Sequence, residues 1–177
     1  MTLNAPGLEN RRLRFEPLCE AHRDVLNTPE TIAAIWKWMP PLTDGTNFDN
    51  YFDFMLAAQA HGAVAAFVLF DRETGTWEGI TGFDTISRQH RRVRIAFAWH
   101  PPATFEPEIF QLTQLSMIKR AMDWRAKRIE WQVYSKNTFF LEHLEAVGAT
   151  REAVLRHEIR MADGSWADKI VISMVYQ

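Results

Sequence analysis

Residues 93–111 read VRIAFAWHPPATFEPEIFQ, a stretch that passes from a strand pattern through a proline-rich turn into a helix pattern. Residues 93–99 read as a strand. Residues 110–125 then show helical spacing of apolar side chains, and residues 128–134 (RIEWQVY) read as the next strand. The expected apolar stripe of this helix is Leu112, Leu115, Ile118 and Met122, widened by Met117, Ala121 and Trp124. This strand–helix–strand order predicts an α/β fold.

The same patterns continue in both directions along the chain. Helices are expected at 20–39, before the breaker Pro40-Pro41, at 47–60, and at 137–147, where Gly148 serves as the C-cap. Further strands are expected at 13–18, 64–71, 79–86, about 150–161 and 167–176, with turns at Thr74-Gly75 and Asp163-Gly164. Because no repeat or linker divides the sequence, residues 1–177 are expected to form one domain with helices on both faces of a mixed sheet.

Composition excludes several classes of protein. The net charge of −2 argues against general nucleic-acid binding, and the single cysteine, Cys19, leaves no disulfide framework. The longest apolar run, 63–70, is too short to span a bilayer, and the first residues lack the apolar segment of a secretion signal, so a cytoplasmic protein is expected. The six histidines form no metal-binding pattern, so no metal is expected. Seven Trp and twelve Phe exceed the needs of a core of this size, which suggests an aromatic pocket or a homodimer surface.

Three segments of the chain have distinctive motifs, and they occur in a recognisable order and spacing. Residues 35–42 (IWKWMPPL) are followed by FDNYFDFML at 48–56, and NTFFLEHLEAVGA at 137–149 spaces Asn137 eleven residues before Gly148. The tail at 153–175 reads AVLRHEIRMADGSWADKIVISMV, and its signature residues are Asp163, Gly164, Trp166, Asp168 and Ser173. Together these segments resemble the GNAT acetyltransferases, over about residues 8–177. The most similar branch is the RimJ/RimL type, which acetylates protein N-termini and related amines.

The resemblance implies a fold and a chemistry. The fold would be an α/β (α+β) domain with a twisted, mostly antiparallel mixed sheet, splayed near residues 97–99, and helices on both faces. The activity would be transfer of an acetyl group from acetyl-CoA to a primary amine, either on a small molecule or on a peptide. Residues implied to contact acetyl-CoA are Phe97, Ala98, Trp99, Asn137 and Phe140, together with the N–H groups of Glu108, Ile109, Phe110 and Gln111 at the helix start, which would meet the pyrophosphate.

Three positions depart from the family pattern. The family has a glycine-rich turn where this chain has Phe105, Glu106, Pro107 and Glu108, and Pro107 has no N–H to donate. The two carboxylates would repel a phosphate by roughly 1 kcal/mol per charge pair at 4 Å in water. They also make a good helix start with proline in its first turn. The pyrophosphate loop is therefore degenerate.

The other two departures concern the catalytic groups. Phe140 replaces a serine that could protonate the leaving thiolate, and it either fills or extends the acyl pocket. Arg94 stands where the branch usually has a glutamate. Tyr134 and Ser135 are the remaining candidates for the acid. An alternative function is therefore a GNAT-fold protein that has lost acetyl-CoA catalysis and serves as a ligand-binding or protein-interaction module.

The candidate base is His100, which follows the central strand directly and has an ordinary pKa near 6.5. Its alternative role is that of a strand-end histidine bonded to the backbone. Asp84 is a candidate for holding the substrate ammonium, and Glu16 has similar status, although either carboxylate also suits the surface.

Two further groups of residues have alternative roles. The run Ser-Arg-Gln-His-Arg-Arg at 87–92 is positively charged and is a candidate for binding an acidic substrate or RNA. The simpler interpretation is a solvated hairpin turn, because no aromatic residues for base stacking are interleaved with the arginines. Trp36 and Trp38 are candidates for an acceptor pocket wall, and one of the two is expected in the core.

Overall fold

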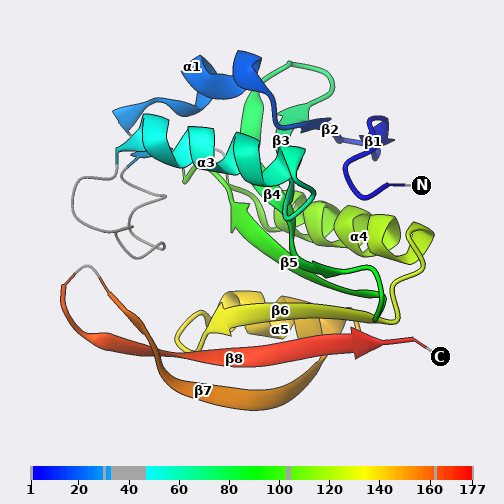
Figure 1. The fold of residues 1–177 in the computed structure, drawn as a ribbon, viewed down its shortest axis with the longest axis vertical. Coiled ribbons are helices and arrows are strands. Elements are labelled where there is room, and N and C mark those ends of the chain that lie inside the picture. Colours follow the sequence, from blue (N-terminus) through cyan, green and yellow to red (C-terminus); the bar gives the residue numbers. More distant parts are fainter. Residues whose placement is uncertain (1, 30, 33–46, 103–104, 162, 177) are drawn as a thin grey trace.

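The computed structural model describes residues 2–29, 31–32, 47–102, 105–161 and 163–176 (Figure 1). In this part of the chain eight strands form one sheet in the order β1-β2-β3-β4-β5-β6-β8-β7. The strands are β1 (Leu8–Glu9), β2 (Leu13–Pro17), β3 (Ala65–Asp71), β4 (Trp77–Ser87), β5 (Arg92–Trp99), β6 (Arg128–Tyr134), β7 (Thr150–Arg160) and β8 (Trp166–Val175). All neighbours pair antiparallel except β5 and β6, which are parallel. The predicted mixed, mostly antiparallel sheet is confirmed.

Helices cover both faces of this sheet, as predicted (Figure 1). They are the short η1 (Glu20–His22) and α1 (Arg23–Leu26), followed by α3 (Phe48–Ala60), α4 (Pro107–Asp123) and α5 (Thr138–Ala146). One core cluster lies under α4 and α5, and the other lies under α1 and α3. Strand β3 contributes Phe67 to the first cluster and Val68 to the second, because successive side chains on a strand point to opposite faces.

Local capping chemistry explains where the helices on the cleft side begin. Helix α4 starts at Pro107 with Glu106 as its N-cap, which confirms that this segment is a helix start. Helix α5 starts after Asn137, whose side-chain oxygen accepts a hydrogen bond of 3.2 Å from the N–H of Phe140. Gly148 follows that helix with φ of +96°, the left-handed conformation expected of a C-cap glycine.

The predicted helix at 20–39 is wrong as one continuous element. The helix ends at Leu26, and the side chain of Thr28 accepts a hydrogen bond of 3.2 Å from the N–H of Thr31, which starts a new turn. The cause is Pro29, which disfavours helical backbone in the residue before it and suits the first turn of a new helix. Residues 33–39 and the breaker Pro40-Pro41 lie outside the described residues.

The apolar stripe of α4 also differs from the prediction. Leu115 and Met122 are 43% and 49% exposed, whereas Met117 and Ala121 are fully buried. The helix is therefore rotated relative to the expected stripe, and it buries Arg120, which donates a hydrogen bond of 2.7 Å to the carbonyl of Ala5. Polar partners in the N-terminal segment make this burial possible, and they are invisible to a periodicity argument.

The tail signature residues hold the β7–β8 hairpin together. Asp163 accepts hydrogen bonds from the backbone N–H and the hydroxyl of Ser165 in the turn. Asp168 accepts a hydrogen bond from the N–H of His157, which has φ of +51° at an irregularity in β7. Ser173 donates to Glu152, and Arg128 also binds this carboxylate, which lowers the pKa of Glu152 to about 2. These residues therefore stabilise the fold and do not line the cleft described below.

Candidate functional site

A cleft of about 440 Å³ lies where the two central strands separate. Strands β5 and β6 pair only over three residues each, ending at Arg94 and Glu130. Beyond that point the edge of each strand that faces the other is unpaired, although β5 still pairs with β4 and β6 with β8. The cleft volume is in the range of pockets that hold small organic ligands. The predicted splay of the sheet is therefore present.

A bulge in β5 shapes one wall of the cleft. Gly82 pairs with Ala96 and Ile80 pairs with Trp99, so β5 has one extra residue over this interval. Phe97 has φ of +60°, which is costly for a residue with a side chain. An unsatisfied buried backbone group costs on the order of 1–3 kcal/mol, so open strand edges here suit a ligand that has amide groups to pair with them.

Aromatic side chains close the end of the cleft between α4 and α5. The ring centroids of Phe110 and Phe140 are 4.7 Å apart, nearly perpendicular, and Phe105 packs edge-on against Phe139 at 5.5 Å. Phe139 also lies 4.0 Å from the ring of His143. Phe105, Phe110, Phe139, Phe140 and His143 form an aromatic wall, and all of them except His143 line the cleft.

His100 lies beside this aromatic wall and is 8% exposed. Its Nδ1 is 2.7 Å from the carbonyl oxygen of Glu78. A carbonyl only accepts hydrogen bonds, so Nδ1 carries the proton and Nε2 keeps its lone pair. Among the described residues Nε2 has no hydrogen-bond partner. Burial lowers the pKa of His100, and the bond to Glu78 partly opposes this, so the imidazole is neutral near pH 7.

The other predicted polar groups lie at different distances from the cleft. Asn137 lines it, and while its side-chain oxygen caps α5, its amide NH2 has no partner among the described residues. Tyr134 also lines the cleft, and burial raises the pKa of its hydroxyl, which keeps the proton in place. Ser135 is not part of the lining; its backbone N–H donates to the carbonyl of Asp168.

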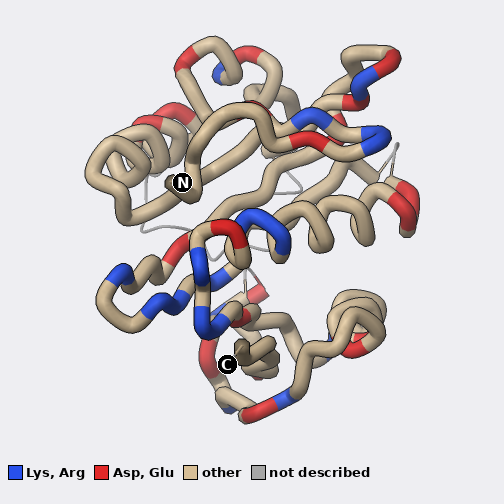
Figure 2. The backbone as a smooth tube through the Cα atoms, turned by 90° about the vertical axis from the view of Figure 1, so that its right-hand side faces the viewer, with Lys and Arg blue, Asp and Glu red and all other residues tan. Residues whose placement is uncertain are grey.

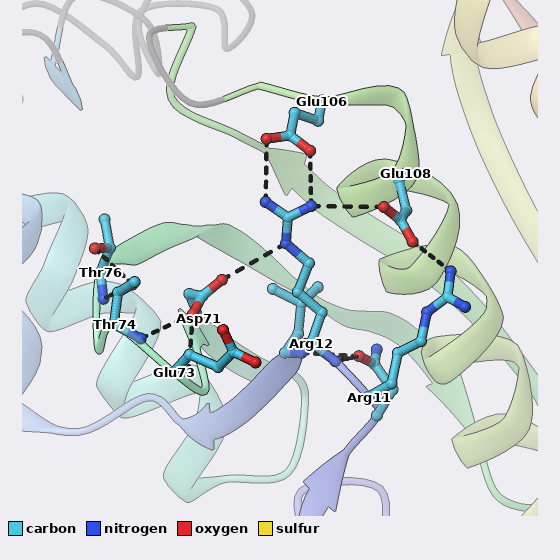
Figure 3. A network of polar contacts seen from close by, with 10 residues as sticks. Arg11, Arg12, Asp71, Glu73, Thr74, Thr76, Glu106 and Glu108 are labelled. Atoms are coloured by element: carbon cyan, nitrogen blue, oxygen red, sulfur yellow. Dashed lines mark hydrogen bonds and ion pairs between the residues drawn. The ribbon is translucent and has the colours of Figure 1, made fainter.

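The two glutamates at the start of α4 point to the turn before β2 (Figure 3). Glu106 accepts two hydrogen bonds from Arg12, of 2.7 and 3.1 Å. Glu108 pairs with Arg11 and lies 3.6 Å from Arg12, which also lies 3.5 Å from Asp71. The contact with Arg12 lowers the pKa of Glu106. Both carboxylates therefore have cationic partners and lie outside the cleft lining.

Charged side chains line the opposite side of the cleft. Arg94 donates to both carboxylate oxygens of Asp84, at 2.6 and 2.8 Å, so Asp84 already has a cationic partner. Lys169 of β8 lies nearby, with its ammonium 5.7 Å from the ring centre of Tyr134. Burial lowers the pKa of Lys169, and the charge of Arg94 lowers it further.

The structure therefore brings most of the predicted site residues together. Phe97, Ala98, Trp99, His100, Phe110, Tyr134, Asn137 and Phe140 line one cleft, whereas Ser135, Glu108, Ile109 and Gln111 lie outside it. The sequence prediction missed Phe139 and Lys169, whereas Phe105 was expected at the cleft in the alternative function. Lys169 lies in the tail signature segment, but its pairing with Tyr134 follows from strand register, which the sequence alone does not give.

The remaining candidates lie elsewhere. Glu16 is outside the cleft, 3.0 Å from Nε2 of His22, and this contact lowers the pKa of Glu16. Residues 88–91 form the turn between β4 and β5, as expected of a solvated hairpin. Over the chain as a whole, Lys and Arg positions are interspersed with Asp and Glu positions (Figure 2). Trp36 and Trp38 lie outside the described residues. Among the described residues no three His, Cys, Asp or Glu side chains are placed to hold a metal ion, and no helix there is long and apolar enough to cross a membrane.

The sequence matches no protein-family model and no curated protein, but the structure is similar to several solved structures. A probable GNAT-family acetyltransferase from Chromobacterium violaceum has a TM-score of 0.76 at 18% identity, over 97% of this chain and 88% of that one. RimL, a ribosomal alpha-N-protein acetyltransferase in complex with coenzyme A, has a TM-score of 0.81 at 12% identity, over 94% and 95%. Mutant SpeG, a spermidine/spermine N-acetyltransferase from Vibrio cholerae, has 0.78 at 15% identity, over 94% and 95%. These likenesses confirm that the chain has the fold of the GNAT acetyltransferases.

Proposed function

We propose that this protein transfers an acetyl group from acetyl-CoA to a primary amine, and that it belongs with the RimJ/RimL-type enzymes. The observation that carries the proposal is the cleft between β5 and β6, with its unpaired strand edges and the bulge at Phe97. Structural similarity to RimL, which was solved with coenzyme A, supports the same assignment.

The inner part of the cleft fits the thioester arm of acetyl-CoA. Backbone groups of β5 around Phe97, Ala98 and Trp99 are free to pair with the amides of that arm, and the NH2 group of Asn137 is a further donor. Acetyl-CoA supplies an activated acetyl thioester. Donors held beside its carbonyl would stabilise negative charge as the amine attacks.

The helix start fits the pyrophosphate less well. Pro107 provides no N–H, and Glu106 and Glu108 bring negative charge, although Arg11 and Arg12 draw their side chains away from the cleft. Of the N–H groups expected at residues 108–111, that of Phe110 already donates to the carbonyl of Glu106 at 3.3 Å, so the proposed contacts are the N–H groups of Glu108 and Ile109. We therefore expect weaker binding of the pyrophosphate than a glycine-rich loop would give.

His100 and Tyr134 are the proposed proton-transfer groups. The free lone pair on Nε2 of His100 can accept a proton from the amine, directly or through water. The hydroxyl of Tyr134, whose pKa is raised, can donate a proton to the departing thiolate. Ser135 is the weaker candidate for the acid, because it does not line the cleft.

A second candidate function is favoured by the aromatic wall. The contact between Phe110 and Phe140 closes the α4–α5 end of the cleft, where the rest of the coenzyme would leave it. In this alternative the chain is a GNAT-fold module that binds another ligand or protein and transfers no acetyl group.

The two functions are distinguished by a transfer assay. Purified protein is incubated with acetyl-CoA and a panel of amines and N-terminal peptides, and free CoA thiol and acetylated product are both measured. Product that depends on the protein and is lost in an Ala98→Phe variant, which fills the cleft, supports acetyl transfer. Absence of product with every amine, together with no binding of acetyl-CoA, contradicts it.

A further inference from the structure

The charged residues of the cleft all lie on the face of the sheet that α3 borders. Asp84, Arg94 and Glu130 are partners in register across β4, β5 and β6, so their side chains share a face. Tyr134 lies on the same face, four residues after Glu130 on one strand, and Lys169 is its partner across β8. The neighbours Ile95 and Trp131 point to the other face, in the core under α4 and α5.

The cleft therefore has two chemically different sides. The α4–α5 side carries the aromatic wall and Asn137, and in the proposed function the coenzyme lies there. The α3 side carries Asp84, Arg94 and Lys169. Because the donor and acceptor must meet at the gap between the strands, the group that contacts the charged side belongs to the acceptor.

The three charged residues that line this side, Asp84, Arg94 and Lys169, together carry one positive charge in excess. Asp84 and Arg94 form a pair with two hydrogen bonds. Glu130, which does not line the cleft, is bound at 2.8 Å by Arg128, which also binds Glu152. Among the described residues, no carboxylate lies within ion-pair distance of Lys169. Glu158 on β7 and Asp84 attract Lys169 only over a longer range, and the positive charge of Arg94 opposes them. A half-buried ammonium without a counter-ion is unfavourable unless a ligand supplies the negative charge.

We infer that Lys169, beside the Arg94–Asp84 pair, forms an anion subsite, so that the acceptor is an amine whose molecule carries a carboxylate close to the amino group. This inference rests on the proposed acetyl transfer. A polyamine, which has only positive charges, would meet Lys169 and Arg94 with like charge and lose affinity. The chain thus has the fold of a spermidine/spermine N-acetyltransferase but a cleft suited to the opposite charge.

The test compares amino acids with the amines left when their carboxylate is removed. The pairs are alanine with ethylamine, phenylalanine with phenethylamine, and lysine with cadaverine. The kcat/KM for acetylation is expected to be about tenfold to a hundredfold higher for the carboxylated member of at least one pair, since a hydrogen bond to a charged group has that effect. Equal values, or a preference for the amine without carboxylate, would overturn the subsite.

A Lys169→Met variant, which keeps the length of the side chain, should lower kcat/KM for the amino acid much more than for the amine that lacks the carboxylate, and so remove this preference. The matched control is Lys119→Met, an exposed residue on α4 that pairs with Asp123. The control should keep the wild-type preference. If Lys169→Met also keeps it, the inference is wrong.

Binding of the products separates the two proposals. N-acetylphenylalanine and N-acetylphenethylamine are titrated into wild-type protein and Lys169→Met, with NMR shifts as the readout. Tighter binding of the carboxylate that depends on Lys169, without acetylation of any amine, would support the subsite and contradict acetyl transfer. Acetylation of amines with no preference for the carboxylate, in either rate or binding, would support acetyl transfer and contradict the anion subsite.

Discussion

Arg12 holds Glu106 through two hydrogen bonds, of 2.7 and 3.1 Å, and so fixes the start of α4 to the turn before β2 (Figure 3). Arg11 does the same for Glu108. The two carboxylates that the sequence alone sets against an incoming phosphate are therefore turned away from the cleft. Their ion pairs link the start of α4 to the turn before β2. The effect on the coenzyme that remains is the repulsion between their negative charges and its phosphates.

The first prediction concerns that charge. A Glu106→Gln, Glu108→Gln variant should bind CoA about tenfold more tightly at low salt, because repulsion of roughly 1 kcal/mol per charge pair is removed and Arg11 and Arg12 are released. Calorimetry at low and high salt measures the effect, which should shrink as salt is added. Glu73→Gln, an exposed carboxylate beside Asp71, is the control. Unchanged or weaker affinity in the double variant would contradict the expectation.

The second prediction concerns Gly79, whose φ is +138° beside the cleft wall. A Cβ there would lie 2.2 Å from the carbonyl oxygen of Trp99 and 2.9 Å from Nδ1 of His100. Gly79→Ala should therefore lower the free energy of unfolding by about 3 kcal/mol or more. Gly75→Ala is the matched control, with φ of +71° and no atom within 4 Å of its Cβ, and should cost only about 1 kcal/mol. Urea unfolding of both variants measures the difference, and equal losses would refute the steric account.

The third prediction concerns pH. Burial lowers the pKa of His100 in the folded state below its ordinary value of 6.5. Well above pH 7 the imidazole is neutral in both states and contributes no pH dependence. As pH falls below 6.5, the unfolded chain takes up a proton that the folded protein resists, so stability is lost until the folded pKa is reached. A His100→Gln variant should lose less stability than the wild type between pH 7 and pH 5. If the variant loses as much free energy of unfolding as the wild type over this pH range, His100 is not the cause of the pH dependence.

The fourth prediction concerns the aromatic wall. Phe140→Ala removes the contact with Phe110 and should lower the free energy of unfolding by about 2 kcal/mol, since Phe140 is half-buried. If the wall blocks the coenzyme, the variant should bind acetyl-CoA where the wild type does not. If the wild type already binds, the variant should bind at similar strength. Phe54→Ala, at a residue 61% exposed, is the control for stability. Loss of acetyl-CoA binding in Phe140→Ala would contradict both outcomes and show that Phe140 holds the coenzyme.

Local signals explain how much of the fold the sequence predicted. Asn137 and Gly148 mark the ends of α5 by their own backbone chemistry, and the Glu-Pro-Glu segment marks the start of α4 in the same way. Pro29 is also a local signal, because proline disfavours helical backbone in the residue before it, and it marks the break in the helix expected at 20–39. The cleft was predicted only through the family resemblance, since no local pattern shows where two strands separate.

Long-range pairs account for what the sequence could not predict. Arg12 and Glu106 are 94 residues apart, so nothing in either neighbourhood indicates that the carboxylate is neutralised. The burial of Arg120 depends on carbonyl groups more than a hundred residues away. The pairing of Asp84 with Arg94 follows from strand register, which became known only with the structure. The roles of individual cleft residues stay predictions.

Calorimetric titration of the purified protein with acetyl-CoA tests the central claim most directly. Ala98→Phe, which fills the cleft, is the test variant, and Ala153→Phe, on the exposed edge strand β7, is its control. Acetyl transfer through the cleft predicts micromolar binding, about −8 kcal/mol, in the wild type and the control, and its loss in Ala98→Phe. No binding by the wild type at millimolar acetyl-CoA, or binding that Ala98→Phe leaves intact, would contradict the claim that this cleft holds the thioester.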